Sequence, residues 1–433
     1  MPCTILRDVP RHVAILGAGP AGASLAAHLM ADRSAAVPAA SAAGAGGPVE
    51  VTLFDGGTRP PLVVGESLVP AVVPFLARLG IEEEVASYST FKPGAIFRFA
   101  PDDWLAFRFD EVRGARSRYA YNVPRDRLDA SIRDAALRAG AHFVPHHGHL
   151  ERDGEGGRVR LSQRSLDAAG LTRQPDFIVD AGGRGRQLAR LLDVPTIQGD
   201  RRDMALHAHL EGVGLIHPND IHTDRLEHGW SWRIPLPGRV SVGLVMDASV
   251  LREFGADAEE QFDAYLRHDP LLSDWGVTAK RISPVVRYTN YQLRATRGTG
   301  PNWALLGDAF GFIDPVFSSG LLIALDGAWE LARALRNGSN RALARFEART
   351  LRQLENWQRV VRYFYDGRLF TLFKIGEEMG DRWYARLLDL HFRKHMPRVV
   401  TGEATTHPYS MGLVDFMVKY GLMEEDPRER AVR

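Results

Sequence analysis

Cysteine and lysine are scarce in this chain of 433 residues, and long apolar runs are absent. The single cysteine, Cys3, excludes an internal disulfide, and no Cys-x-x-Cys pair exists to bind zinc or to exchange electrons. No apolar run reaches the ~20 residues of a membrane-spanning helix, and the first residues lack the apolar core of a secretory signal. The 54 basic and 53 acidic residues nearly balance, which gives no reason to expect nucleic acid or an anionic membrane as partner. These absences predict a cytoplasmic globular protein.

The few lysines are unevenly placed. Of the 54 basic residues only five are lysines, and Lys92 is the only one before residue 280. We interpret the general preference for arginine as a compositional habit of the chain. Lys92, in the segment Phe91-Lys92-Pro93-Gly94, is then an exception that calls for a functional explanation.

A glycine-rich turn follows the first apolar segment. His12–Leu16 has the composition of a buried strand, an alanine-rich stretch follows to about Met30, and the turn between them has the spacing Gly-x-Gly-x-x-Gly. Here the glycines permit a tight turn, close approach of the backbone to a pyrophosphate and close packing of helix on strand. The free N–H groups at the start of the helix also attract phosphates. The pattern predicts a dinucleotide held by Gly17, Ala18, Gly19, Ala21 and Gly22.

Further segments favour FAD over NAD as that dinucleotide. A second predicted strand over 49–54 ends at Asp55, which can accept hydrogen bonds from a ribose, and an Ala/Gly-rich loop over 34–47 accounts for its distance from the turn. Two later strands, 176–180 and 302–306, also end in glycine turns. A flavin laid in extended form across a domain needs several such backbone approaches. We expect Asp308 to bind the ribityl chain and Arg125, at the start of a helix, to pair with the pyrophosphate.

The order of elements predicts an α/β fold. Alternating segments over 95–110 indicate a hairpin, 123–139 an amphipathic helix, 200–285 a mostly antiparallel sheet, and 341–422 a set of helices. We predict a doubly wound (GR2-type) FAD-binding domain with an inserted antiparallel substrate layer and a helical C-terminal region. The FAD-binding domain is discontinuous, over 10–95, 123–198 and 283–338; the substrate layer covers 96–122 and 199–282, and the helical region covers 339–433.

Three short segments resemble the flavin-dependent halogenases. The family's marker Trp-x-Trp-x-Ile-Pro is complete at 230–235, Gly-Glu-Ser-Leu-Val-Pro stands at 65–70, and Phe-Ile-Asp-Pro-Val-Phe-Ser-Ser-Gly at 312–320 matches the family's flavin and halide loop. The resemblance covers most of residues 12–335 and fades in the C-terminal helices. It implies that Ser67 and Pro315 also contact the flavin.

The resemblance implies a reaction and a separation of tasks. FADH2 from a separate flavin reductase would react with O2 to a C4a-hydroperoxide, and chloride or bromide would attack its distal oxygen to give hypohalous acid. Ser319 and Gly320 match the family's halide pair, in a loop whose backbone N–H groups suit a small anion; a plain helix N-cap explains the same serine. Trp230 and Trp232 place their rings on one side of a strand. They would shield the flavin, although two core tryptophans remain the alternative.

Lys92 falls at the family's active-site lysine. A desolvated lysine has a lowered pKa and can act as a nucleophile or a proton donor. It would hold hypohalous acid by a hydrogen bond or become a haloamine, which an arginine could not because its guanidinium stays charged. The alternative is an accidental surface lysine.

Phe317 departs from the tryptophan-halogenating members, which carry a glutamate in this loop. The resemblance therefore implies a phenolic or pyrrolic substrate, either a small aromatic molecule or an aromatic bound to an acyl- or peptidyl-carrier protein, as in antibiotic and other secondary-metabolite biosynthesis. The competing classes are a flavin-dependent monooxygenase, a geranylgeranyl-reductase-like flavoprotein and a non-catalytic flavin-binding scaffold.

Two further patterns stay open. His147-x-His149 and His207-x-His209 could each pair imidazoles on a strand, but no cysteine or acidic third ligand accompanies them, so we predict no metal. Aromatic residues of the C-terminal helices would line a substrate pocket or form a core. They are Trp357, Tyr363, Phe364, Tyr365, Phe370, Phe373, Trp383 and Tyr384.

Overall fold

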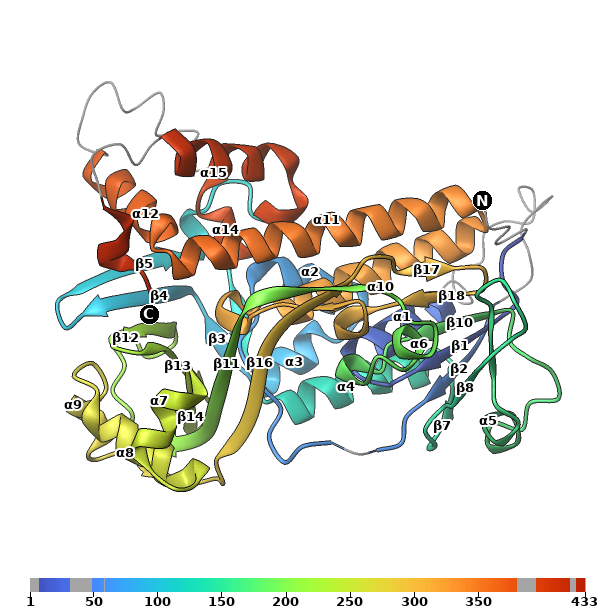
Figure 1. Ribbon diagram of the computed structural model, residues 1–433, viewed down its shortest axis with the longest axis horizontal. Coiled ribbons are helices and arrows are strands. Elements are labelled where there is room, and N and C mark those ends of the chain that lie inside the picture. The colour runs from blue at the N-terminus through green and yellow to red at the C-terminus, as the bar shows by residue number, and fades with distance from the viewer. Residues whose placement is uncertain (1–7, 32–48, 58, 380–394, 421–425, 433) are drawn as a thin grey trace.

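A computed structural model describes residues 8–31, 49–57, 59–379, 395–420 and 426–432. The predicted loop over 34–47, together with Trp383 and Tyr384, lies outside these residues. The described chain contains two large sheets, helices that pack on them and a group of C-terminal helices, and the long helix α11 runs along the long axis of the molecule (Figure 1). Among the described residues, no helix combines the length and the apolar character needed to cross a membrane.

The smaller sheet is the predicted dinucleotide-binding sheet. Its five parallel strands have the spatial order β7-β2-β1-β10-β18, which is 3-2-1-4-5 in chain order. This order is typical of doubly wound α/β domains and confirms the predicted α/β class. The central strands are buried throughout, which explains why they appear as continuous apolar runs. The strands are β1 (His12–Leu16), β2 (Glu50–Phe54), β7 (His142–Val144), β10 (Phe177–Asp180), β18 (Trp303–Leu305) and the short antiparallel β17 (Thr299–Gly300).

Helix α1 (Pro20–Met30) packs between α4 (Arg125–Arg138) and α10 (Ser319–Asn337). It begins with proline at its first position, where the missing N–H costs nothing. Nearly all of its residues are buried, because alanine and glycine let the neighbouring helices approach closely. The dinucleotide turn is thereby held between a rigid strand and a rigid helix.

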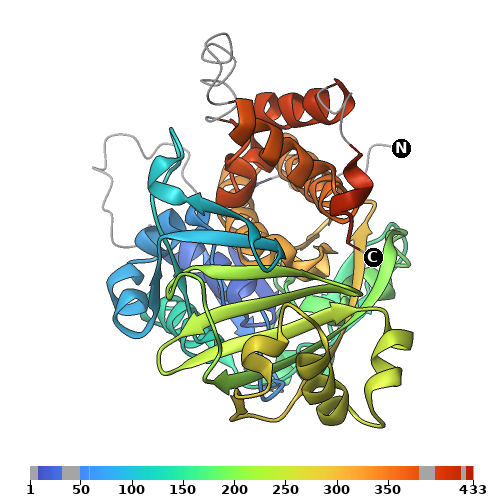
Figure 2. The same cartoon turned by 90° about the vertical axis from the view of Figure 1, so that its left-hand side faces the viewer.

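The larger sheet has the order β19-β16-β11-β14-β13-β12-β4-β5 and faces the viewer in Figure 2. Its pairs are antiparallel except for β4 with β12, which is parallel. The predicted hairpin is present as β4 and β5. The strands are β4 (Gly94–Ala100), β5 (Asp103–Arg108), β11 (Thr196–Glu211), β12 (Ile221–Leu226), β13 (Gly229–Leu236), β14 (Arg239–Met246), β15 (Lys280–Arg281), β16 (Val286–Ala295) and β19 (Gly311–Phe312).

Two features differ from the sequence-based expectation. The segment expected to be mostly sheet also contains the helices α7 (Ala248–Leu251), α8 (Ala258–His268) and α9 (Ser273–Gly276). Asp257 caps α8 through the N–H groups of the next two acidic residues, a start signal that was available in the sequence. Strand β16 pairs with β11 in the larger sheet, although it falls within the range 283–338 expected in the FAD-binding domain.

The C-terminal aromatic residues form a core. Trp357, Phe364, Phe370 and Phe373 are buried. Phe364 packs on Phe370, and other ring contacts of the four are with Phe97, Phe107 and Phe317. The core interpretation is therefore confirmed for these four. The remaining helices and strands are α2 (Val73–Arg78), α3 (Glu82–Tyr88), α5 (Gln163–Ala168), α6 (Gln187–Leu191), α11 (Asn340–Tyr365), α12 (Arg368–Met379), α14 (Arg398–Thr401), α15 (Pro408–Tyr420), β3 (Thr90–Lys92), β6 (Ala120–Asn122), β8 (Leu150–Arg152) and β9 (Val159–Leu161).

Candidate active site

A cavity of about 1080 Å³ lies at the carboxyl ends of the parallel strands. All three glycine turns contribute to its wall, which is where ligands bind in open α/β sheets. Gly22, Ser319 and Lys92 are the only predicted site residues that do not line it. Those that do are Gly17, Ala18, Gly19, Ala21, Asp55, Ser67, Arg125, Trp230, Trp232, Asp308, Pro315 and Gly320.

Each glycine of the first turn occupies a different environment. Gly17 has φ 101°, and a Cβ there would lie 2.5 Å from the carbonyl oxygen of Ala181. A Cβ on Gly22 would lie 2.0 Å from the carbonyl oxygen of Gly17, so this glycine is needed for the turn to close against the helix. A Cβ on Gly19 would meet nothing within 4 Å, because this position faces the open cavity.

Two helix N-termini border the cavity. Helix α1 has Gly19 as its N-cap, without a side-chain cap and without an acidic residue in its first turn. Helix α10 follows Ser318, whose φ of 53° is left-handed and whose side chain does not cap the helix either. Their first N–H groups therefore stay available for an anion, and the helix dipoles favour it. The wall has the donors that a pyrophosphate and a halide would need.

Charged groups surround the predicted ribose and phosphate positions. The Asp55 carboxylate accepts hydrogen bonds from the backbone N–H of Gly57 (3.0 Å) and from Arg59 (3.3 Å). Arg125 donates from Nε to Asp129 at 3.0 Å, which holds its guanidinium at the cavity. Burial raises the pKa of Asp308, and Arg125 is among the charges that oppose this shift. The residues present fit an extended flavin nucleotide.

The tryptophan pair forms part of the wall on the sheet side. Trp230, Trp232 and Ile234 are alternate residues of β13 and all line the cavity, which confirms that the two rings share one face. The ring centroids are 5.8 Å apart. Trp230 Nε1 donates to the hydroxyl of Tyr365 at 2.9 Å, and Trp232 Nε1 donates to Ser241 at 3.2 Å. Both rings are thus held in place.

Lys92 is buried, with 2% of its surface exposed, which rules out the accidental surface lysine. Its Nζ donates hydrogen bonds of 2.8 Å to Ser67 Oγ and of 2.8 Å to the carbonyl oxygen of Leu68. Ser67 lines the cavity, so the amine lies one hydrogen bond behind the wall. Burial lowers the pKa of Lys92 to about 7, with Asp220 opposing the shift.

Lys92→Met is expected to stabilise the fold near neutral pH. Below pH 7 the Lys92 amine is charged in the folded protein, and its burial lowers the free energy of unfolding by the full amount. This loss of stability shrinks as pH rises above the folded pKa of about 7, and it vanishes above the ordinary lysine pKa of 10.5. We expect the free energy of unfolding of the variant to exceed that of the parent by about 1–3 kcal/mol near pH 7, after allowing for the unpaired carbonyl left behind.

Urea unfolding near pH 7 and near pH 10 measures this difference, which should close at the higher pH. Lys280→Met, at an exposed position of β15, is the matched control and should change stability little at either pH. Equal stability of Lys92→Met and its parent at both pH values would show that the amine is not desolvated in the folded state.

The predicted halide pair is divided between the wall and the layer behind it. Gly320 lines the cavity, whereas Ser319 is fully buried and its hydroxyl has no hydrogen-bond partner. Phe317, two residues earlier, packs against Trp357 and Phe364 at ring distances of 6.1 and 5.8 Å. A glutamate at 317 would bury a carboxylate among aromatic rings, which gives a physical reason for the departure from glutamate.

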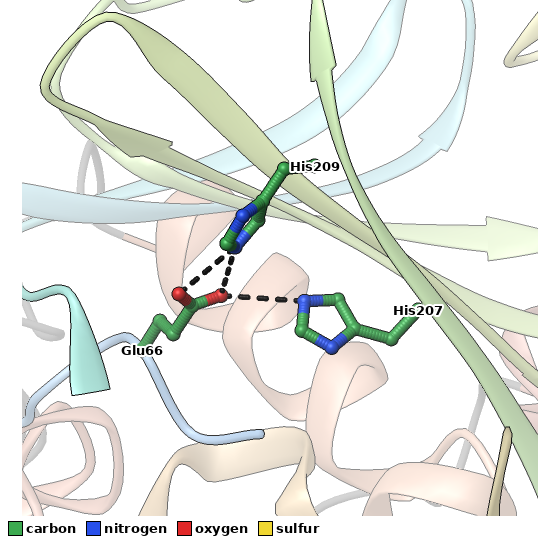
Figure 3. A group of neighbouring side chains, drawn as sticks. All are labelled: Glu66, His207 and His209. Carbon is green, nitrogen blue, oxygen red and sulfur yellow. Dashed lines mark hydrogen bonds and ion pairs between the residues drawn. The ribbon is translucent and has the colours of Figure 1, made fainter. Parts of the chain in front are cut away.

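A buried polar cluster escaped the sequence reasoning. Glu66 lies between two residues of the cavity wall, and its carboxylate contacts His207 and His209 of β11 (Figure 3). Burial alone would raise the pKa of Glu66, but the hydrogen bonds from both histidines outweigh it and lower the pKa to about 2. The sequence predicts no metal at this histidine pair because no acidic third ligand stands in a recognisable pattern with it. The acid instead comes from a segment 143 residues before His209.

The fold and cavity together define a dinucleotide-binding α/β protein with room for an extended cofactor. A family model described as tryptophan halogenase matches residues 12–113 and 106–369. The chain therefore belongs to the tryptophan halogenase family of flavin-dependent halogenases.

Individual relatives differ in how much of their length is matched. A tryptophan 2-halogenase from Chondromyces crocatus is 28% identical over 336 residues, which cover 75% of this chain and 61% of the relative. A 1H-pyrrole-2-carbonyl-(peptidyl-carrier protein) chlorinase from Pseudomonas fluorescens is 25% identical over 408 residues, covering 85% and 86%. The solved flavin-dependent brominase Bmp2 has a TM-score of 0.73 at 19% identity, covering 95% of this chain and 98% of that one, which shows a shared fold. The chain thus spans less than two thirds of the first of these relatives.

Proposed function

We propose that this protein is an FADH2-dependent halogenase that acts on an electron-rich aromatic ring. The observation that carries the proposal is the buried Lys92 amine, one hydrogen bond behind the cavity wall that holds the glycine turns and the tryptophan pair. In this proposal the glycine turn holds the pyrophosphate, Asp55 the ribose and Asp308 the ribityl chain of a GR2-type FAD site. Bound reduced flavin would reduce O2 by two electrons to the oxidation level of a peroxide, which is the oxidant that turns chloride or bromide into hypohalous acid.

The residues of this chain then have separate tasks. The N–H groups at the start of α10, with Ser319 and Gly320, hold the halide, and Trp230 and Trp232 keep the substrate away from the flavin. The neutral amine of Lys92 attacks hypohalous acid, forming an N–halogen bond and releasing water. The aromatic ring takes the halogen from nitrogen and loses a proton, which restores the amine. A pKa of about 7 suits this cycle, because a large fraction of the amine is neutral near that pH.

We further propose a phenolic or pyrrolic substrate, free or tethered to a carrier protein, and a separate reductase as the source of reduced flavin. The pyrrole-carrier chlorinase named above supports the tethered form, because it is matched over most of both chains. The aromatic packing of Phe317 supports a ring that reacts without help from a carboxylate.

Turnover with photoreduced FAD and bromide, over a panel of free and carrier-bound phenols and pyrroles, tests the proposal. A brominated product identified by mass would support it. Oxygen-18 incorporated into the product without halide dependence would identify a monooxygenase instead, and saturation of an isoprenoid chain without O2 would identify a reductase of the geranylgeranyl type.

Ser319→Ala is expected to raise the KM for halide about tenfold or more, because one hydrogen bond to an anion contributes roughly 1.5–3 kcal/mol. Ser24→Ala is the matched control, since Ser24 is also fully buried with an unpartnered hydroxyl but lies within α1. Steady-state halogenation against halide concentration measures the effect. An unchanged KM for Ser319→Ala would remove this hydroxyl from the halide site.

A further inference from the structure

Three buried side chains from two distant segments converge beside the cavity (Figure 3). Glu66 belongs to the segment before α2, and His207 and His209 are alternate residues of β11, on the same face of the strand. Their exposed fractions are 4%, 1% and 6%. One ligand atom of each lies within 4.8 Å of the others, and the three do not line the cavity.

The distances suit ligands of one ion. His209 Nε2 lies 3.0 Å from both carboxylate oxygens of Glu66, and His207 Nε2 lies 3.3 Å from Oε2. Neighbouring ligands of an ion bound at about 2.0–2.1 Å are separated by about 2.9–3.4 Å, depending on the angle between them. Two imidazole nitrogens and one carboxylate oxygen are a donor set used for Zn²⁺ and for non-haem Fe²⁺.

The charge of the cluster also calls for a cation. Glu66 forms its ion pairs with these two histidines and with no lysine or arginine of the described chain. A buried carboxylate needs a compensating positive charge. A divalent ion held by the carboxylate and both imidazoles would supply it.

An ion bound by these three residues would link parts of the structure that hold Lys92 and Trp232. Ser67, next to Glu66, accepts the hydrogen bond from Lys92. The histidines belong to β11, which pairs with β14, and Ser241 of β14 accepts the hydrogen bond from Trp232. An ion here would therefore tie the segment that positions the lysine to the strand beside the one that supports the tryptophan wall.

We infer that Glu66, His207 and His209 form a binding site for a divalent transition-metal ion, Zn²⁺ first of all, outside the cofactor cavity. The inference rests on the donor geometry and not on the halogenase activity. Its role is to hold two walls of the site together, and Zn²⁺ itself has no redox chemistry.

Metal content of the purified full-length chain, equilibrated with Zn²⁺ and freed of excess by gel filtration, tests the inference. We expect about one zinc per chain in the parent and in His12→Asn, a control that changes a buried histidine bonded to Thr52 outside the cluster. At least nine tenths of the bound zinc should be lost in each of the variants Glu66→Gln, His207→Asn and His209→Asn. Zinc retained by all three variants, or no zinc in the parent, would overturn the site and leave a hydrogen-bonded Glu–His cluster.

If the variants fail to fold, X-ray absorption at the zinc edge of the parent protein tests the proposed ligands directly. Two imidazole nitrogens and a carboxylate oxygen at about 2.0–2.2 Å would support the site, and a shell without imidazole would overturn it. Neither readout depends on turnover, so failure of this inference and failure of the proposed activity are distinguishable.

Discussion

Lys92→Met should reduce halogenation by about 10²–10⁴-fold, the range that a positioned catalytic side chain commonly contributes. Methionine keeps the length of the side chain in its buried position but cannot form an N–halogen bond or donate a hydrogen bond. Lys92 itself does not line the cavity in which the flavin is expected, so FAD binding should be unchanged. Product formation with photoreduced FAD and bromide, together with a flavin titration of the apoprotein, measures both quantities.

Three controls make the result specific to the amine. Lys280→Met should halogenate like the parent, because Lys280 is exposed on β15. Lys92→Arg keeps the positive charge but should stay inactive, because a guanidinium remains protonated. In the parent, the rate should rise with pH through about 7, as the amine loses its proton, and Lys92→Met should lack this limb. Halogenation retained by Lys92→Met with normal flavin binding would contradict the assignment.

Gly22→Ala should abolish FAD binding and destabilise the fold by about 1–3 kcal/mol or more, as overpacking of a closed core does. The new Cβ would lie 2.0 Å from a backbone oxygen, that of Gly17, so the turn itself has to move. Because the helix N-terminus moves with it, the N–H groups that would face the pyrophosphate lose their alignment. Fluorescence titration with FAD and thermal unfolding of the apoprotein measure the two effects.

Gly19→Ala is the matched substitution in the same turn. Its Cβ meets nothing within 4 Å and its φ of −69° is open to alanine, so stability should change little. The methyl group would nevertheless enter the cavity where the pyrophosphate is expected, and FAD affinity should fall at least tenfold, or about 1.4 kcal/mol. Parent-like FAD affinity in Gly19→Ala would mean that the turn does not hold the cofactor.

Several parts of the site followed from the sequence because their causes are local. The turn after β1 was predictable since only glycine fits at Gly17 and Gly22, where backbone lies within 2.5 Å of any added Cβ. The shared face of Trp230 and Trp232 followed from the alternation of side chains along a strand. The importance of Lys92 was indicated by composition, because it stands alone among arginines over the first 279 residues.

Other parts depend on contacts between distant segments and could not be predicted. The burial of Lys92, which lowers its pKa, is a property of the folded chain, and its hydrogen-bond partners Ser67 and Leu68 lie 25 and 24 positions before it. Glu66 joins the histidine pair only because the segment before α2 passes over β11. The parallel pairing of β4 with β12 likewise has no local signal, since β-strand register is decided by the partner.

The sequence alone determined the parallel nucleotide-binding sheet, its glycine turns and the family, because strand periodicity and steric demands at glycine are properties of neighbouring residues. Tertiary structure alone decided which polar groups are desolvated together, namely the amine behind Ser67 and the Glu66–His207–His209 cluster. Desolvation and charge compensation depend on everything packed around a group, and here the partners come from other segments of the chain: Ser67 is 25 positions from Lys92, and Glu66 is 143 positions from His209.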